Sequence, residues 1–558
     1  MASLRLSFAD SAAEHIKTDQ ADWLIYGTDS TSVAETIGSG TNFGTVVNKV
    51  TSLPGEYSLI AVEKGPPTVV RAYRGITSSF DVFYCRRPSD GTIIVGDHFR
   101  NVLAELPTSD RTVADSVATD QLLFGTKPQG TYVEEVERLG HGETLEWEVD
   151  GSPRVEQFES LSVDETISPS EAKQRLNRYF SDAIDEGRFE ESVVTMLSGG
   201  VDSTLIQSYL DTDATVSAAF DSPEFGTEVD YARRASELLG SDHQLIELDE
   251  DEFCDYVEKA TAATGYPLQH LQATLMYATV SETPYQVYLN GQLADGLFGT
   301  GNAALAHLSQ YIGRFVHLLP SVAPEIDKLA EVAKGMRAPV TDPNGLAMSF
   351  VIHTDEDRVA DILSEEAIRE RKKERLHYTR KRVDVDDDRG YASHMHLGHF
   401  IDFFQDNTVT PWRHAAHAAG KTLFTPFADR KVIETLLKVP ASKRYARFAV
   451  PPKNDPKLVT KRKYLLKELL ENRIPEYNTR KAKGSSALPL HRYFEDGPLS
   501  NVFDRYSIPD FVPDEKQSLI RDGADHISWY AFSYAVWEKQ ILENENLELL
   551  EKTSMIEM

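Results

Sequence analysis

Cysteine is scarce in this sequence, with only Cys85 and Cys254 among 558 residues. Two cysteines cannot form a disulfide framework or a zinc site with four cysteine ligands. We therefore expect both to be small buried apolar residues in a reducing compartment.

Long apolar runs are also missing. No stretch of about 18 apolar residues occurs, so no membrane-spanning helix is predicted. Residues 1–6 lack the basic flank and the apolar core of a signal peptide. Both absences predict a cytoplasmic protein that has no membrane partner.

Positive charge is in short supply, because 58 lysine and arginine residues stand against 88 aspartate and glutamate residues, a formal net charge of −30. This balance argues against a general nucleic-acid binder, whose surface should be basic. The acidic residues are dispersed along the chain, and such a surface is one way in which proteins stay soluble in concentrated salt. The composition favours a halophilic source over an acidic protein from an ordinary cytoplasm.

The net charge leads to a prediction about salt. Carboxylates repel one another across the surface, and the Debye length falls from about 8 Å at ~0.15 M salt to about 3 Å at ~1 M. We expect the unfolding temperature to rise with potassium chloride because this repulsion is screened. Thermal melts from dilute to multimolar salt test the prediction, and a flat or falling midpoint would favour the ordinary acidic protein.

What the sequence does contain is material for packed cores, with 41% hydrophobic and 9% aromatic residues. The length suits three or four average domains, or two larger ones. Up to about residue 160, short alternating runs broken by turn residues predict a β-rich domain. The expected elements are strands over residues 57–62, 68–73, 82–84 and 92–95, a helix near residues 98–106, and a polar linker over residues 151–167.

After residue 160, strands and helices alternate. Ser168, Pro169 and Glu171 mark the start of an amphipathic helix over residues 168–189. Further on we expect strands over residues 192–197, 214–220, 243–248 and 286–289, and helices over residues 202–210 and 229–239. This rhythm predicts a doubly wound parallel sheet with right-handed crossovers, and the chain is expected to be mostly helical from about residue 300 to its end. The predicted domains are therefore residues 1–160 and 161–558.

A glycine-rich turn lies between the first strand and the first helix of the second domain: Leu197-Ser198-Gly199-Gly200-Val201-Asp202-Ser203. Its glycines let backbone N–H groups approach an anion, and the following helix directs its positive end there. Ser198 and Ser203 can donate hydrogen bonds to phosphate oxygens, and Asp202 can hold magnesium. The turn is predicted to bind the phosphates of a nucleotide.

This string resembles the pyrophosphate loop of the ATP pyrophosphatases and differs from a Walker A loop, which would end in Gly-Lys-Ser/Thr. Four further segments resemble those of the asparagine synthetase family, which shares this loop. They are Asn290-Gly291-Gln292-Leu293-Ala294-Asp295-Gly296-Leu297-Phe298-Gly299; Thr425-Pro426-Phe427-Ala428-Asp429; Lys463-Tyr464-Leu465-Leu466-Lys467 followed by Ile474-Pro475; and Arg480-Lys481-Ala482-Lys483-Gly484.

The first domain is similar to the glutaminase domain of the same family, in residues 55–59 and in several motifs between residues 123 and 142. The resemblance implies an α/β fold: a β-rich sandwich of the glutaminase (N-terminal nucleophile) type, then a doubly wound parallel-sheet adenylating domain with a helical C-terminal extension. A working glutaminase of this type uses a cysteine exposed by removal of Met1, and here that position is Ala2. We expect the first domain to be inactive towards glutamine and to act as a scaffold.

The resemblance also implies the site, with ATP and magnesium as cofactors. Asp202 and Asp295 are the expected magnesium ligands, and Asp295 is also counted among the catalytic residues. Lys481 or Lys483 is expected to stabilise charge on the pyrophosphate and on the tetrahedral intermediate. The expected nucleotide contacts are Leu197, Ser198, Gly199, Gly200, Val201, Asp202, Ser203 and Gly291.

The chain departs from the family where the amine is handled. The family's glutamate four residues before the Pro-Phe pair is Thr422 here, and its arginine two residues before that proline is Phe424. In the Asn290–Gly299 segment, the two glutamates that the family has are replaced by Gln292 and Gly296, and its middle glycine is replaced by Leu293. The parts that handle ATP persist, so activation of a carboxylate is expected to survive while the nucleophile differs.

The expected activity is ATP-dependent amide formation through an acyl-adenylate, on a small molecule or a peptide that has a carboxylate. The product is left open between asparagine made from ammonia, a β-lactam and a lasso-type macrolactam. A tRNA-modifying pyrophosphatase is disfavoured by the acidic composition, and a silent interaction protein by the intact loop and its two aspartates. No nucleic-acid partner is expected, and the sequence leaves open whether the chain forms a homodimer.

Five histidines precede the Pro-Phe pair, and they are His394, His396, His399, His414 and His417. His414 and His417 could share a helix face and bind a metal. Their spacing matches no zinc signature, and no cysteine cluster accompanies them. Structural or substrate-lining histidines are the favoured interpretation.

Overall fold

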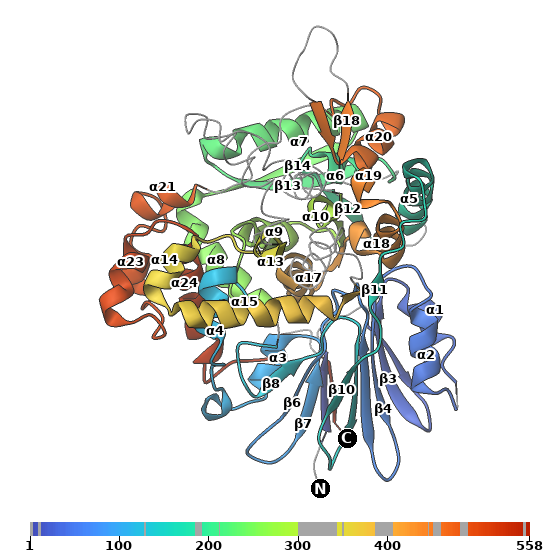
Figure 1. Ribbon diagram of the computed structural model, residues 1–558, viewed down its shortest axis with the longest axis vertical. Coiled ribbons are helices and arrows are strands. Elements are labelled where there is room, and N and C mark those ends of the chain that lie inside the picture. The colour runs from blue at the N-terminus through green and yellow to red at the C-terminus, as the bar shows by residue number, and fades with distance from the viewer. Residues whose placement is uncertain are drawn as a thin grey trace.

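The computed structural model describes residues 4–8, 13–38, 40–127, 130–184, 192–210, 213–298, 343–348, 351–384, 406–444, 446–449, 459–479, 489–550 and 554–557. The fold is a mixed α/β fold, in which the first 157 residues form most of two sheets that are largely antiparallel, and a parallel sheet follows (Figure 1). Among these residues, no helix is both long enough and apolar enough to cross a membrane.

Two sheets pack face to face near the N-terminus and are here called the N-terminal sandwich. Apolar residues from both sheets, such as Leu6 and Val95 from one and Ile60 and Val70 from the other, meet in one buried cluster. Along residues 57–63, alternate side chains face different cores: Ile60 and Val62 belong to this cluster, and Leu59 and Ala61 belong to a second one. The first sheet has the order β20-β1-β7-β6-β8 and the second the order β10-β9-β5-β4-β3-β2.

The strands of the sandwich have the following bounds: β1 Leu4–Phe8, β2 Glu14–Lys17, β3 Ala21–Gly27, β4 Tyr57–Glu63, β5 Val69–Arg74, β6 Phe83–Arg86, β7 Ile93–Gly96, β8 Val136–Arg138, β9 Glu143–Glu148, β10 Arg154–Gln157 and β20 Ser554–Glu557. The four predicted strands therefore exist, as β4, β5, β6 and β7. The helices beside them are α1 Ser30–Ala34, α2 Phe43–Val50, α3 Phe99–Ala104 and α4 Val117–Phe124.

The last strand, β20, was not predicted, and it lies in a part of the chain that is mostly helical, as expected. It pairs antiparallel with β1, so that Arg5 lies opposite Glu557 and Leu6 opposite Ile556. In Figure 1 the marks for the two chain ends lie close together at the foot of the sandwich. Local pattern cannot reveal a strand that pairs across almost the whole chain, because its stabilising contacts are far away in sequence.

The prediction of a linker over residues 151–167 is wrong in part. Strand β10 lies within it and pairs with β9 as an edge of the second sheet. A second short strand, β11 (Leu161–Ser162), pairs with β16 (Val383–Asp384). All four residues of β10 are exposed, so the segment has the polar composition of a loop although its backbone is paired.

The second half of the chain is built on a five-stranded parallel sheet with the order β14-β13-β12-β15-β17. Its strands are β12 Val193–Met196, β13 Ala214–Phe220, β14 Asp242–Leu248, β15 Val287–Leu289 and β17 Thr422–Phe424. The chain runs outward from β12 to β14 and then returns to the other side of β12. The strand order therefore reverses between β12 and β15, which is the place where doubly wound sheets bind ligands.

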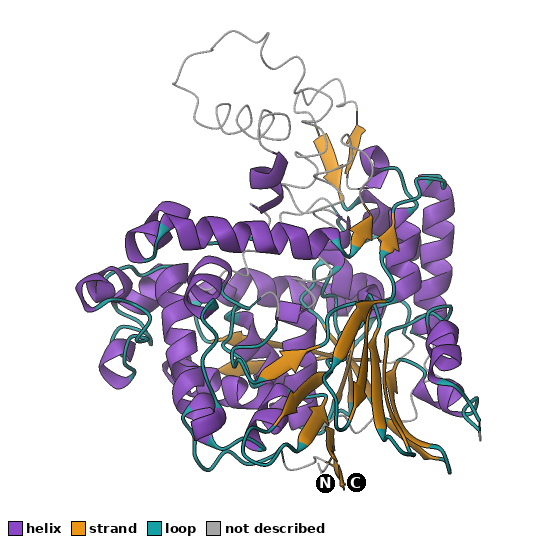
Figure 2. Cartoon of the chain, turned by 60° about the horizontal axis from the view of Figure 1, so that its bottom comes forward, coloured by secondary structure: helices purple, strands orange, loops and turns teal. Residues whose placement is uncertain are grey.

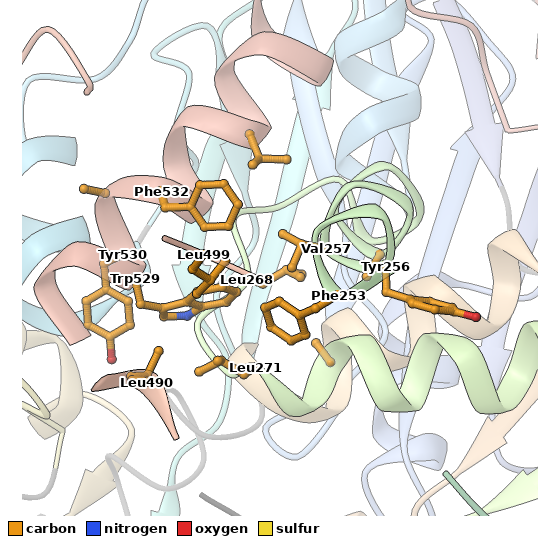
Figure 3. Close-up of a cluster of buried hydrophobic side chains, with 14 of the residues drawn as sticks. Phe253, Tyr256, Val257, Leu268, Leu271, Leu490, Leu499, Trp529, Tyr530 and Phe532 are labelled. Carbon is orange, nitrogen blue, oxygen red and sulfur yellow. The ribbon is translucent and has the colours of Figure 1, made fainter. Parts of the chain in front are cut away.

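Helices cover both faces of this sheet (Figure 2). One face is packed by α8 Phe253–Thr264, α9 Gln272–Glu282, α17 Thr410–Ala418 and α24 His526–Trp537. The other face is packed by α5 Pro169–Ala183, α6 Val201–Gln207, α18 Arg430–Leu437 and α20 Tyr464–Arg473. Figure 3 shows part of the first of these cores, where the Phe253 ring lies beside Trp529 and Val257.

The start of α5 follows its sequence signal. Ser168 caps α5 and its hydroxyl oxygen accepts a hydrogen bond from the Glu171 backbone N–H at 3.2 Å, as the capping pattern predicts. The helix ends at Ala183, earlier than the predicted residue 189. The second-domain strands before residue 290 lie where they were predicted, but β17, the fifth strand of the sheet, was not predicted.

The remaining described elements complete the helical part of the chain. They are α7 Gly226–Leu239, α10 Ala294–Phe298, α13 Pro343–Met348, α14 Glu356–Ile362, α15 Glu365–Arg380, α19 Ala441–Arg444, α21 Leu490–Glu495, α22 Val502–Arg505, α23 Gln517–Arg521, and the hairpin strands β18 Ala446–Ala449 and β19 Val459–Arg462. Cys85 is buried as predicted, and burial raises the pKa of its thiol to about 12. Cys254 is half-buried, and its thiol donates to the Pro498 carbonyl oxygen at 3.2 Å.

Candidate functional site

The glycine-rich turn joins β12 to α6 at the strand-order reversal. The Ser198 backbone N–H donates to the Ser203 hydroxyl oxygen at 3.2 Å, and the two hydroxyl groups are 3.1 Å apart. The Gly200 N–H donates to the Ser198 hydroxyl oxygen at 3.3 Å. Ser198 is exposed at the mouth of the turn, so its hydroxyl and the neighbouring N–H groups can exchange these internal bonds for bonds to phosphate oxygens.

Gly199 is the residue that makes the turn this tight. Its φ is +65°, in the left-handed region, and a Cβ atom there would lie 2.1 Å from the backbone carbonyl of Tyr231 on α7. The hydroxyl of Tyr477 donates to the Gly199 carbonyl oxygen at 2.6 Å. Only glycine therefore fits this position, and helix α7 and Tyr477 hold the turn from two sides.

A second loop follows β15 and packs against the first. A Cβ atom added to Gly291 would be 2.9 Å from the Ser203 backbone nitrogen, so the two loops touch along their backbones. The Asn290 side-chain oxygen accepts from the Gln292 N–H at 3.0 Å and from the Thr425 hydroxyl at 3.2 Å. The Pro-Phe segment that begins with Thr425 is thereby joined to the loop that leads to Asp295.

Leu293 in this second loop has a φ of 71°, although it is not a glycine. The resemblance places a glycine there, and a left-handed backbone is the conformation that glycine adopts without cost. Leucine in this region costs about 1–2 kcal/mol. Its side chain is only 5% exposed and belongs to the core beside α20, and this burial compensates for the backbone cost.

Lys463 brings the two aspartates of the site together. Its ammonium nitrogen lies 2.6 Å from Asp202 Oδ2 and 2.5 Å from Asp295 Oδ1. Asp202 is on the first turn of α6 and Asp295 on the first turn of α10, while Lys463 precedes α20 with a φ of 51°. A non-glycine residue in this conformation at a buried ion cluster is typical of a functional position.

The opposite charges of Lys463 and the two aspartates stabilise each other. Burial alone would lower the pKa of the Lys463 ammonium, but the charges of Asp202 and Asp295 outweigh burial and raise it. The lysine therefore stays protonated at neutral pH. The lysine side chain is 13% exposed, those of Asp202 and Asp295 are 20% and 43% exposed, and the cluster remains open to solvent on the Asp295 side.

This donor set suits a magnesium ion that is shared with phosphate oxygens. Mg²⁺ in nucleotide sites is usually held by one or two carboxylates together with substrate phosphates and water. Asp202 and Asp295 supply two carboxylates that face one centre, and in this structure the cation between them is the Lys463 ammonium. Among the described residues there is no group of three or more metal-ligating side chains that would bind a metal without phosphate.

The structure places most of the predicted site residues in one region. Ser198, Gly199, Gly200 and Ser203 form the turn, and Gly291 packs against it. Leu197 is fully buried and belongs to the core, as does the half-buried Val201, so both shape the turn through packing. Lys481 and Lys483 lie outside the described residues, and their assignment stays a prediction.

Sequence reasoning assigned no role to Lys463 or Tyr477. Lys463 is the first residue of the Lys-Tyr-Leu-Leu-Lys segment. The sequence signal that could have identified it is a lysine immediately before a helix, in a chain that resembles a family of pyrophosphate-releasing enzymes. No local signal singles out Tyr477, which is 278 positions after its hydrogen-bond partner Gly199 in the sequence.

Two of the five histidines can be placed, and His394, His396 and His399 lie outside the described residues. His414 and His417 are buried on α17. Burial, together with the nearby His98 and His417, lowers the pKa of the His414 imidazole well below its usual value. The His414 ring lies 4.3 Å from that of His98 and faces the N-terminal sandwich, which agrees with the structural interpretation.

A comparison with known proteins found no curated protein that matches the chain. The family model described as asparagine synthase matches residues 175–521, more than half of the chain, and the match includes the turn, both aspartates and Lys463. It does not include the N-terminal sandwich, so the likeness of that part to a glutaminase stays a prediction. The chain belongs to the asparagine synthase family, whose members are ATP-dependent ligases.

Proposed function

We propose that this protein activates a substrate carboxylate with ATP as an acyl-adenylate and joins it to an amine, releasing AMP and pyrophosphate. The observation that carries the proposal is the Lys463 ammonium held between Asp202 and Asp295, next to the Ser198–Ser203 turn. An ammonium cation, together with two carboxylates that would hold magnesium, beside a turn that can bind anions is a set of groups that can stabilise a departing pyrophosphate.

Each residue has a role in this proposal. The N–H groups of the turn and the Ser198 and Ser203 hydroxyls bind phosphate oxygens of ATP. Asp202 and Asp295 would hold magnesium, which would neutralise charge on the pyrophosphate. Lys463 then moves from the two carboxylates towards phosphate oxygens, where its ammonium donates hydrogen bonds as negative charge develops on the leaving group.

The amine half of the reaction is less constrained by the chain. Thr422, where the family has a glutamate, is the first residue of β17 and lies opposite Val287 in the sheet. A threonine cannot take a proton from an amine as a carboxylate does. The incoming amine must therefore be deprotonated by another group, and ammonia, an amine within the same small molecule and the N-terminus of a peptide all remain as candidates.

The proposal is tested by ATP–pyrophosphate exchange and by isotope transfer. Candidate acids whose carboxylate carries ¹⁸O are incubated with ATP, magnesium and an amine. An acyl-adenylate route transfers one carboxylate ¹⁸O to AMP and exchanges labelled pyrophosphate into ATP. Formation of ADP and phosphate, or of AMP that contains no ¹⁸O, would contradict it.

We further expect that the protein does not hydrolyse glutamine. The position that carries the nucleophilic thiol in the glutaminases is Ala2, and the thiol of Cys85 is buried in the first sheet of the N-terminal sandwich with a pKa raised to about 12. Glutamate is assayed after incubation with glutamine, ATP and magnesium. Release of glutamate above an enzyme-free control would contradict the prediction.

A further inference from the structure

Helix α17 presents a row of polar residues to the N-terminal sandwich. The row consists of Asp406, which precedes the helix, and Thr410, Arg413, His414 and His417 within it. Their spacing of three and four residues places them on one face of a helix. All five are buried, none more than 7% exposed, so this face is covered by other parts of the chain. A buried polar face of this kind is stable only when its groups have partners.

Asp406 is bound by two arginines and one histidine of the sandwich. Its Oδ1 accepts from Arg74 Nη2 at 2.6 Å and lies 2.9 Å from His141 Nε2, while its Oδ2 is 3.0 Å from Arg138 Nη2. Burial would raise the pKa of this carboxyl group, but Arg138, Arg74 and His141 outweigh burial and hold it well below its usual value. The charge is therefore retained in the interior and fixes the start of the helix.

Arg413 forms an ion pair with a carboxylate of the sandwich. Its Nη2 donates to Glu56 Oε1 at 3.1 Å and its Nε to the Ser79 hydroxyl at 2.9 Å. The guanidinium carbon lies 3.9 Å from the centre of the Phe80 ring. One turn earlier, the Thr410 hydroxyl donates to the Ser79 carbonyl oxygen at 3.2 Å. These directional contacts define the rotation of α17 about its axis, which apolar packing alone defines less strictly.

The far end of α17 leads directly to the candidate site. The helix is followed by β17, and the Asn290 backbone N–H donates to the Phe424 carbonyl oxygen at 3.2 Å. The next residue, Thr425, bonds the Asn290 side chain. Asn290 begins the loop that carries Asp295, whose carboxylate contacts Lys463. An unbroken series of bonded elements thus runs from Glu56 in the sandwich to one of the two aspartates of the site.

We propose that Glu56 and Arg413 are positioning residues, through which the N-terminal sandwich sets the separation of Asp295 from Asp202 and hence the affinity for magnesium and nucleotide. The inference rests on the proposed function in one respect, namely that the site binds magnesium and nucleotide. It does not depend on which reaction follows. It gives the sandwich a role in the reaction that does not depend on glutamine.

A second buried pair between the same parts of the chain provides a matched control. Arg371 on α15 bonds both carboxylate oxygens of Asp120 on α4, at 2.8 and 2.7 Å. Asp120 is fully buried, as Glu56 nearly is, and the side-chain hydrogen bonds of Arg371 go to Asp120 and Glu374, which are outside both loops of the site. A substitution at Asp120 therefore measures the effect of losing a buried carboxylate that does not contact α17.

The experiment compares the variants Glu56→Gln, Arg413→Lys, Arg413→Ala and Asp120→Asn with the wild-type full chain. Magnesium is titrated by calorimetry in the presence of α,β-methylene-ATP, which cannot release pyrophosphate, and unfolding temperatures are recorded separately. We expect Glu56→Gln to weaken magnesium binding about threefold or more. Arg413→Lys, which keeps the charge, should restore part of that loss relative to Arg413→Ala, and Asp120→Asn should lower only the unfolding temperature.

The outcomes separate the two proposals. Wild-type magnesium binding without pyrophosphate exchange contradicts the proposed chemistry and leaves the comparison of variants valid. Equal magnesium affinity in Glu56→Gln and the wild type, or an equal loss in Asp120→Asn, overturns the positioning role. If Glu56→Gln does not fold, Ser79→Ala removes the second partner of Arg413 at lower cost and is judged by the same criteria.

Discussion

Replacing Asp202 by asparagine is expected to abolish ATP–pyrophosphate exchange. Asparagine has the same shape, but it removes one of the two negative charges that face Lys463 and would hold magnesium. A loss of three orders of magnitude or more, about 4 kcal/mol of transition-state stabilisation, is the expected scale for a site that depends on this charge. Exchange of labelled pyrophosphate into ATP measures it directly.

The fold should survive this substitution. Asp202 occupies the first turn of α6, where loss of a negative charge costs about 0.3–1 kcal/mol. Asp230→Asn on the neighbouring helix α7 is the control, because Asp230 pairs only weakly with Arg233 at the surface. Exchange at the wild-type rate in Asp202→Asn, with Asp230→Asn also active, would show that the magnesium site lies elsewhere.

Replacing Lys463 by methionine is expected to lower the rate of adenylation about 100-fold or more, because a cation that stabilises the leaving pyrophosphate is lost. Methionine fills a similar volume, so the packing beside α20 should persist. Without the ammonium, Asp202 and Asp295 face each other as like charges, and the magnesium-free protein should become less stable. Single-turnover AMP formation measures the rate, and thermal melts with and without magnesium measure the second effect.

Lys173→Met is the matched control for this prediction. Lys173 on α5 pairs with Glu468 on α20 at 2.5 Å, so the same substitution removes an ion pair from the same helix without touching the site. Exposed or half-exposed pairs of this kind contribute about 0–1 kcal/mol. If the two variants lose activity equally, Lys463 acts through the stability of α20 and has no part in the chemistry.

The local parts of the site could be predicted from the sequence because they are made by neighbouring residues. A buried strand, two glycines and a helix start lie close together in the sequence and predict the Ser198–Ser203 turn. The same holds for the start of α5, where the cap Ser168, Pro169 and Glu171 lie within four residues. The family resemblance also supplied Asp202 and Asp295, which the structure brings to one lysine.

The distant parts could not be predicted in this way. Lys463 reaches Asp202 across 261 residues, and β20 pairs with β1 across nearly the whole chain. Strand β17 has three residues and carries no pattern of its own, yet it supports the loop that leads to Asp295. Such contacts depend on which surfaces the fold brings together, and a single sequence does not record this pairing in its local pattern.

The sequence by itself therefore determined the α/β class, the anion-binding turn, the two aspartates and the scarcity of positive charge. Only the tertiary structure decided that Lys463 lies between those aspartates, and that Asp406 and Arg413 of α17 are held by Arg74 and Glu56 of the sandwich. The physical reason is that turns and caps are stabilised by hydrogen bonds between near neighbours. A buried charge is stable only beside the partner that folding brings to it from elsewhere in the chain.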